Sequence, residues 1–131
     1  MEHLWRLALV GLGGALGSMA RYWVGAVMAA RLGAAFPYGT ITVNTLGSFL
    51  IVVIIHVSLT APSTISADLR LFLTTGVLGG FTTYSSFNQE TLKMLEQGDY
   101  LLGAGNTVLT VLGCLLAGAL GMAVGRWLVP G

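Results

Sequence analysis

The sequence predicts an all-α integral membrane protein with four transmembrane helices per subunit. Of its 131 residues, 55% are hydrophobic and only 8% are charged, whereas about a quarter of the residues in soluble domains are charged. Residues 32–67, 71–89 and 100–125 contain no Asp, Glu, Lys or Arg. Since a helix needs about 20 mostly apolar residues to cross a bilayer, these blocks and the apolar N-terminal segment predict four crossings in one transmembrane domain, residues 1–131.

Charge and cysteine content exclude several other classes of protein. A net charge of +1 leaves no basic surface that could follow a nucleic acid backbone. Cys114 is the single cysteine, so the chain has neither an internal disulfide nor a cysteine cluster with zinc spacing. The sequence presents no nucleophile paired with a base and no phosphate-binding loop, and we expect the protein not to be an enzyme.

The first two predicted helices span about residues 5–30 and 39–59. Arg21 lies within or at the end of the first helix, and a turn-forming Phe-Pro-Tyr-Gly segment at residues 36–39 separates the two. The N-terminal residues 1–20 could instead form a signal peptide. Apolar residues resume directly after Arg21, however, which favours a longer, uncleaved helix.

The third predicted helix spans residues 69–96 and is broken near residues 76–83, where glycines and hydroxyl side chains interrupt the apolar pattern. The fourth helix spans residues 101–127. An unwound backbone inside a membrane leaves carbonyl oxygens without hydrogen bonds, and such carbonyls can coordinate a cation such as Na+. A simple kink repaired by hydroxyl groups is the alternative, and the segment alone leaves both possibilities open.

Basic residues are distributed almost equally between the two sides of this arrangement. Lysine and arginine in short loops set the orientation of a membrane protein, so a near balance permits insertion in both directions and an antiparallel homodimer. A fixed orientation set by other details is an equal alternative. One side has Arg6, Arg70 and Arg126, the other has Arg31 and Lys93, and Arg21 is unassigned.

Glycine is abundant, with 19 residues, and forms two pairs at a spacing of four. Gly13 and Gly17 lie on the first predicted helix, and Gly121 and Gly125 lie on the last. Small residues four apart let helix backbones approach closely in lipid. We therefore expect these pairs to mark contacts between helices.

Polar side chains recur at helical spacing in three of the predicted helices. Hydroxyl and amide hydrogens and the edges of aromatic rings all present positive charge, so such a lining suits a small anion. Interhelical hydrogen bonds that only hold the bundle together are the alternative. The three sets are Thr40, Asn44 and Ser48; Asn106, Thr110 and Cys114; and Thr82, Thr83, Ser85 and Ser86 with the aromatic residues Tyr84 and Phe87.

Two charged residues lie close to these polar sets. Arg21 is either an attractor for anions at an aqueous vestibule or an arginine that reaches the lipid headgroups. Glu90 follows the break, but no acidic residue lies within the polar sets themselves. A cation pathway built from rings of carboxylates is therefore less favoured.

Three motifs in this order resemble the CrcB/Fluc family of bacterial fluoride channels, over nearly the whole chain. The most specific is Gly-Gly-Phe-Thr-Thr-Tyr-Ser-Ser-Phe at residues 79–87, similar to the family's segment in the third helix. The others are the glycine-rich run at residues 11–17, followed by Ala20-Arg21-Tyr22, and the segment at residues 39–49 that contains Asn44. The resemblance implies passive fluoride export across the bacterial cytoplasmic (inner) membrane by a dual-topology antiparallel homodimer with two pores and one structural Na+ at the dimer interface.

The resemblance also implies roles for individual residues. The backbone carbonyls of Gly79 and Thr82 would bind the structural Na+. Arg21 and Glu90 match polar family positions with a vestibule or structural role. Tyr84 replaces the first phenylalanine of the family's aromatic pair, and its added hydroxyl could itself donate to the anion. The anion pore would be lined by Asn44, Tyr84, Ser85, Ser86, Phe87 and Thr110.

Two other functions are compatible with four membrane helices. A proton-coupled small multidrug transporter needs a membrane-embedded glutamate in its first helix, where this chain has Arg21 and no acid after Glu2. A membrane accessory subunit without transport would use the polar side chains only for packing. Replacing Asn44 or Phe87 would then change stability but not ion flux.

Overall fold

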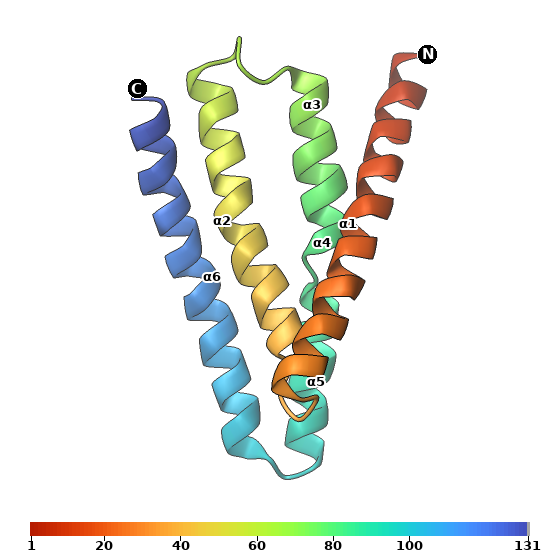
Figure 1. The fold of residues 1–131 in the computed structure, drawn as a ribbon, viewed down its shortest axis with the longest axis vertical. Helices are drawn as coiled ribbons and strands as arrows, with labels where there is room; N and C mark the ends of the chain where they lie inside the picture. The colour runs from red at the N-terminus through yellow and green to blue at the C-terminus, as the bar shows by residue number, and fades with distance from the viewer. Residues whose placement is uncertain (131) are drawn as a thin grey trace.

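The computed structural model describes residues 1–130, and in these residues the chain is helical apart from short connections (Figure 1). Three long helices are α1 (Glu2–Leu32), α2 (Tyr38–Thr60) and α6 (Tyr100–Leu128). Between α2 and α6 the chain forms one bent rod of four shorter pieces. These pieces are α3 (Ala67–Leu71), the π-helix η1 (Phe72–Leu78), α4 (Gly79–Phe81) and α5 (Tyr84–Glu96).

The helices α1, α2 and α6 are each long and apolar enough to cross a membrane, with 31, 23 and 29 residues. The structure is thus an all-helical membrane fold with three long apolar spans. The remaining helix, which comes third along the chain, is bent. Both α2 and α6 begin and end within one residue of the ranges expected from the sequence. The α1 helix is longer than expected at both ends and stops before Gly33, whose φ of 87° lies in the left-handed region that favours glycine.

The break in the third helix is shorter than the sequence indicated. We expected irregular backbone near residues 76–83, but the chain stays helical through Phe81, with wider π-type turns from Phe72 to Leu78. Only Thr82 and Thr83 are extended, with ψ of 159° and 107°. The glycines do not unwind this helix because they serve close packing: a Cβ on Gly80 would lie 3.0 Å from the Gly14 Cα of α1.

The two glycine pairs are helix contacts, as their spacing predicts. Gly13 and Gly17 are buried, and a Cβ on Gly13 would lie 2.7 Å from the Phe72 carbonyl oxygen. On α6, a Cβ on Gly121 would lie 2.6 Å from the Phe49 carbonyl oxygen. The first pair brings α1 against the bent rod and the second brings α6 against α2.

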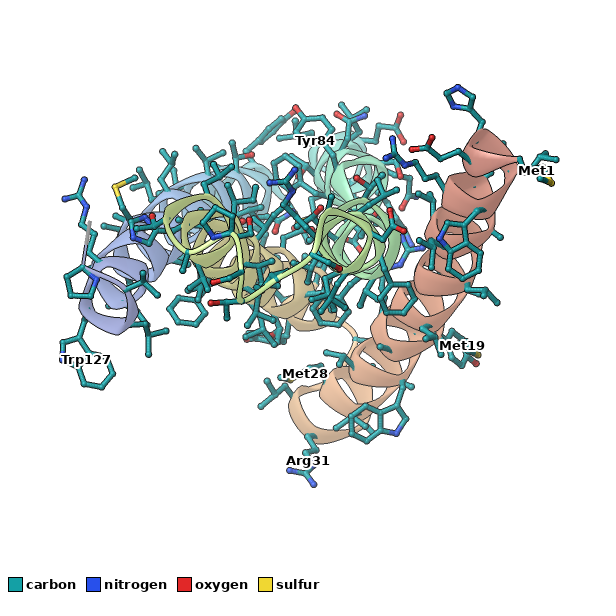
Figure 2. All side chains as sticks on the ribbon, turned by 90° about the horizontal axis from the view of Figure 1, so that it is seen from above. Met1, Met19, Met28, Arg31, Tyr84 and Trp127 are labelled. Carbon is teal, nitrogen blue, oxygen red and sulfur yellow. The ribbon has the colours of Figure 1, made fainter. Side chains whose placement is uncertain are left out.

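The arrangement is open rather than a closed bundle. Among the described residues α1 and α6 do not contact each other, and they form opposite edges of the molecule (Figure 1). The buried apolar cluster of Val43, Leu78 and Phe81 is small, while many leucines are exposed and side chains project outward all around the helices (Figure 2). An apolar exterior of this kind is what a lipid environment requires.

Candidate functional site

A groove of about 480 Å³ runs along the molecule between α2, the bent rod and α6. It contains most of the residues singled out by sequence. Of the residues expected to line the pore or to bind Na+, six line this groove: Asn44, Gly79, Thr82, Tyr84, Phe87 and Thr110. Four helices and the connection between α4 and α5 thus bring these six residues, up to 66 positions apart, to one surface.

Asn44 forms hydrogen bonds with the backbone of Thr83 at the break. Its Nδ2 donates to the Thr83 carbonyl oxygen at 3.0 Å, and its Oδ1 accepts from the Thr83 backbone N–H at 2.7 Å. Asn44 is 8% exposed, and an unpaired backbone group at such a place would cost about 1–3 kcal/mol. Since the amide has two hydrogens and Thr83 uses one, the second remains for another acceptor.

The same contacts release the carbonyls of Gly79 and Thr82. In a continuous α-helix the Thr83 N–H would bond to the Gly79 carbonyl, and the Ser86 N–H would bond to the Thr82 carbonyl. Instead the Thr83 N–H donates to Asn44, and the Ser86 N–H donates to the Thr83 hydroxyl at 3.2 Å. Gly79 and Thr82 both line the groove, and carbonyl oxygens without helical partners are hard ligands of the type that suits Na+.

Tyr84 and Phe87 form an aromatic pair at the start of α5. Their ring centroids are 5.5 Å apart with an interplanar angle of 63°, an edge-to-face arrangement. Phe87 is 7% exposed and Tyr84 is 79% exposed, and Tyr84 lies at the outer edge of the helices (Figure 2). The Phe87 ring is therefore fixed within the protein, while the Tyr84 ring and hydroxyl face outward.

Ser85 and Ser86 do not line the groove. Ser85 is exposed, with its hydroxyl 3.3 Å from that of Thr83. The Thr83 hydroxyl donates to the Ser86 hydroxyl at 3.0 Å. Ser86 lies instead at a smaller cavity of about 100 Å³ on the other side of the break.

Arg21 and Glu90 lie at two small adjoining cavities. Arg21 lines the cavity of about 100 Å³ together with Ser86 and Thr40. Glu90 lines a cavity of about 190 Å³ under the loop of residues 33–37, and its Oε1 accepts from the Thr40 hydroxyl at 2.8 Å. No ion pair joins Arg21 to Glu90 among the residues described.

The polar set on α6 is divided. Thr110 and Cys114 line the groove, as their spacing indicates. Asn106 is 0% exposed and bonds to Thr110 and to Thr91 on α5. Sequence spacing could place Asn106 on the same helix face as Thr110, but it could not indicate Thr91 as its partner.

No cluster of three or more His, Cys, Asp or Glu side chains occurs in the part of the chain that the structure describes. The groups that the groove residues offer an ion are backbone carbonyls, amide and hydroxyl groups, the Cys114 thiol and ring edges. Carbonyl oxygens suit a cation, while amide hydrogens, hydroxyl hydrogens and ring edges suit an anion.

Comparison with known proteins gives one consistent result. A family model described as "CrcB-like protein, Camphor Resistance (CrcB)" matches residues 8–122. The chain is 50% identical over 122 residues to a protein of Sorangium cellulosum, covering 93% of this chain and 95% of the relative. It is 52% identical to one of Anaeromyxobacter dehalogenans, covering 94% and 97%, and 49% identical to one of Thermus thermophilus, covering 86% of each.

All three relatives are named "Fluoride-specific ion channel FluC". The family match covers far more than half of the chain, and the first two alignments extend over nearly the full length of this chain and of each relative. The chain is therefore a multi-pass membrane protein that belongs to the CrcB-like family.

Proposed function

We propose that the protein is a fluoride-selective channel that lets fluoride leave the bacterial cytoplasm passively and so relieves fluoride toxicity. The observation that supports this most is the near-full-length identity, about 50%, to proteins named fluoride-specific ion channels. The groove adds a physical reason, because it places amide, hydroxyl and ring-edge groups beside one another in an otherwise apolar protein. Passive ion flow breaks no covalent bond, and the protein is not an enzyme.

The anion contacts proposed for the groove follow from its hydrogen-bond donors. Fluoride must shed water to enter, and preplaced donors replace that water in steps. Asn44 offers its second amide hydrogen, Phe87 its ring edge, and Tyr84 its edge and hydroxyl. Thr110 contributes a hydroxyl, Arg21 draws anions towards the smaller cavity, and Ser85 and Ser86 support the break. Glu90 takes a structural polar role through Thr40.

The working unit is an antiparallel homodimer in which a second copy covers the groove. The groove is open on one side, and Tyr84 is far more exposed than Phe87. The near balance of basic residues between the two sides allows both orientations. Two copies related by a two-fold axis would then enclose two pores.

A structural Na+ at the dimer interface is the further part of this proposal. The carbonyls of Gly79 and Thr82 have lost their helical partners and lie at the groove that the second copy would cover. Two copies would bring four such carbonyl oxygens together at the axis. The ion would coordinate the carbonyl oxygens that the break leaves without hydrogen bonds.

Fluoride efflux from liposomes tests the proposed function. Purified protein is reconstituted with internal fluoride, a potassium ionophore relieves charge build-up, and chloride is the control anion. We expect fast fluoride efflux without a proton gradient and little chloride efflux. Fluoride that moves only with a proton gradient would favour the coupled transporter, and fluoride retained by folded dimers would favour the accessory subunit.

A further inference from the structure

Asn106 occupies an unusual place beside the groove. It is 0% exposed, and only Val43 is comparably enclosed among the large side chains described. A buried amide in a membrane helix is costly unless all its groups are paired. Its partners therefore indicate what it does.

The hydrogen bonds around Asn106 fix the orientation of its amide. The Thr91 hydroxyl donates its single hydrogen to the Phe87 carbonyl at 2.8 Å, so its oxygen is left to accept from the Asn106 Nδ2 at 2.9 Å. The Asn106 Oδ1 then faces the other way, towards Thr110. The Thr110 hydroxyl donates to this oxygen at 3.4 Å.

This chain of bonds joins two of the groove's side chains. Through Thr91 it ties the backbone of Phe87 on α5 to α6, and through Oδ1 it holds the hydrogen of the Thr110 hydroxyl. A distance of 3.4 Å is long for a hydrogen bond between a hydroxyl and a carbonyl oxygen. The Thr110 hydroxyl can therefore turn from Asn106 towards an anion at small cost.

We propose that Asn106 is a positioning residue of the anion path, which fixes Phe87 through Thr91 and supplies the resting acceptor for the Thr110 hydroxyl. Asn106 itself does not touch the anion, because it is fully enclosed. The Thr110 hydroxyl is held in one orientation when no anion is beside it and is released when one arrives. This inference rests on the proposed fluoride channel function.

Fluoride and chloride efflux from liposomes test the role with two variants. Asn106→Leu removes both bonds of Asn106, whereas Thr91→Val removes the Asn106–Thr91 bond and the bond from Thr91 to the Phe87 carbonyl but keeps the bond to Thr110. We expect Asn106→Leu to lower fluoride efflux by about tenfold or more and to lower the fluoride-to-chloride ratio. Thr91→Val should lower fluoride efflux and the fluoride-to-chloride ratio by smaller amounts. The double variant should lose no more fluoride efflux than Asn106→Leu alone. The control is Thr107→Val, since exposed Thr107 bonds only to Gly103 of its own helix.

Asn106→Leu or Thr91→Val dimers with wild-type efflux and selectivity would contradict the proposal, as would fully additive losses in the double variant. A readout independent of transport is hydrogen exchange of side-chain amides in protein labelled with ¹⁵N at its three asparagines. We expect slow exchange at Asn106 in wild type and faster exchange in Thr91→Val, and fast exchange in wild type would contradict the positioning role. If wild type passed no fluoride, the proposed function would fail, while amide exchange would still decide whether Asn106 holds this position.

Discussion

Asn44 illustrates how a single side chain can hold open a break in a membrane helix. An amide has one acceptor and two donor hydrogens, so it can pair with both the N–H and the C=O of Thr83 and still present a hydrogen to an ion. Thr83 contributes in turn by capping α5 through the Ser86 N–H. Asn44 and Thr83 thus pair with the backbone of the break, and Asn44 keeps one amide hydrogen for an ion.

Asn44→Ala should destabilise the protein and reduce fluoride efflux. The substitution removes two buried hydrogen bonds and leaves the Thr83 backbone unpaired, a loss of roughly 2–4 kcal/mol. Unfolding of the purified protein in detergent measures the stability, and liposome efflux measures the function. The control is Thr42→Ala, because Thr42 bonds only to Tyr38 of its own helix; equal stability of the two variants would contradict the role of Asn44 at the break.

Tyr84→Phe should conduct fluoride at a rate within about threefold of wild type. The change removes the hydroxyl but keeps the ring edge and the edge-to-face contact with Phe87, which is worth about 0.5–1.5 kcal/mol. Tyr84→Leu removes both and should conduct at a rate about tenfold lower. Liposome efflux compares the three proteins, and a loss in Tyr84→Phe as large as in Tyr84→Leu would assign the contact to the hydroxyl instead of the ring.

Among the helices, glycine determines which surfaces meet. α1 approaches the bent rod closely at Gly13 and Gly17, while Gly11 on the same helix has no other atom within 4 Å of an added Cβ. Gly76 and Gly80 serve the same contact from the other side. Glycine content alone therefore does not identify an unwound segment in this fold.

Gly17→Ala and Gly11→Ala should have opposite effects on stability. An added Cβ at Gly17 collides with backbone atoms around Val77, and overpacking of this kind costs about 1–3 kcal/mol. At Gly11 the Cβ meets open space, and alanine is a better helix former by about 1 kcal/mol. Denaturation in detergent measures both variants, and equal stability would contradict the close contact between α1 and η1.

Most helix boundaries could be predicted from the sequence, because they depend on apolar length and local turn residues. The ends of α2 and α6 follow from uncharged runs bounded by Pro37 and Asp99. The extent of the break could not be predicted, since the close packing of Gly76 and Gly80 against α1 joins segments far apart in the sequence. Hydrogen bonds between segments far apart in the sequence could not be predicted either.

The candidate site could be predicted in part. Six of the residues selected by spacing and resemblance line one groove in the structure. Neither signal indicated that Ser86 lies at another cavity. The two bonds between Asn44 and Thr83 join residues 39 positions apart, and local patterns carry no information on such a pair. The same is true of Asn106 and Thr91.

The whole molecule is an open arrangement of helices, and the proposed second copy would cover its groove. A lipid-facing groove would leave the Gly79 and Thr82 carbonyls and the free Asn44 hydrogen without hydrogen bonds, which is costly in hydrocarbon. In the proposed dimer, a second copy in the opposite orientation would remove this cost and place the two breaks against each other. In this proposal the same contact between two copies forms the dimer and closes the pore.

Labelling of a single introduced cysteine should occur from both sides of the membrane. Ala35→Cys in a Cys114→Ser background places one thiol in the exposed loop between α1 and α2. If the chain inserts in both orientations, an impermeant thiol reagent reaches about half of the molecules from each side. Labelling from one side only would contradict the antiparallel dimer.

The comparison of Phe87→Ile with Tyr100→Ile most directly tests whether the groove is the fluoride path. Phe87 is enclosed at the groove, whereas Tyr100 is exposed at the start of α6 and does not line it. Fluoride efflux is measured in liposomes containing equal amounts of each dimeric variant. We predict that Phe87→Ile lowers efflux by at least about tenfold while Tyr100→Ile conducts like wild type; wild-type efflux in dimeric Phe87→Ile would contradict the account.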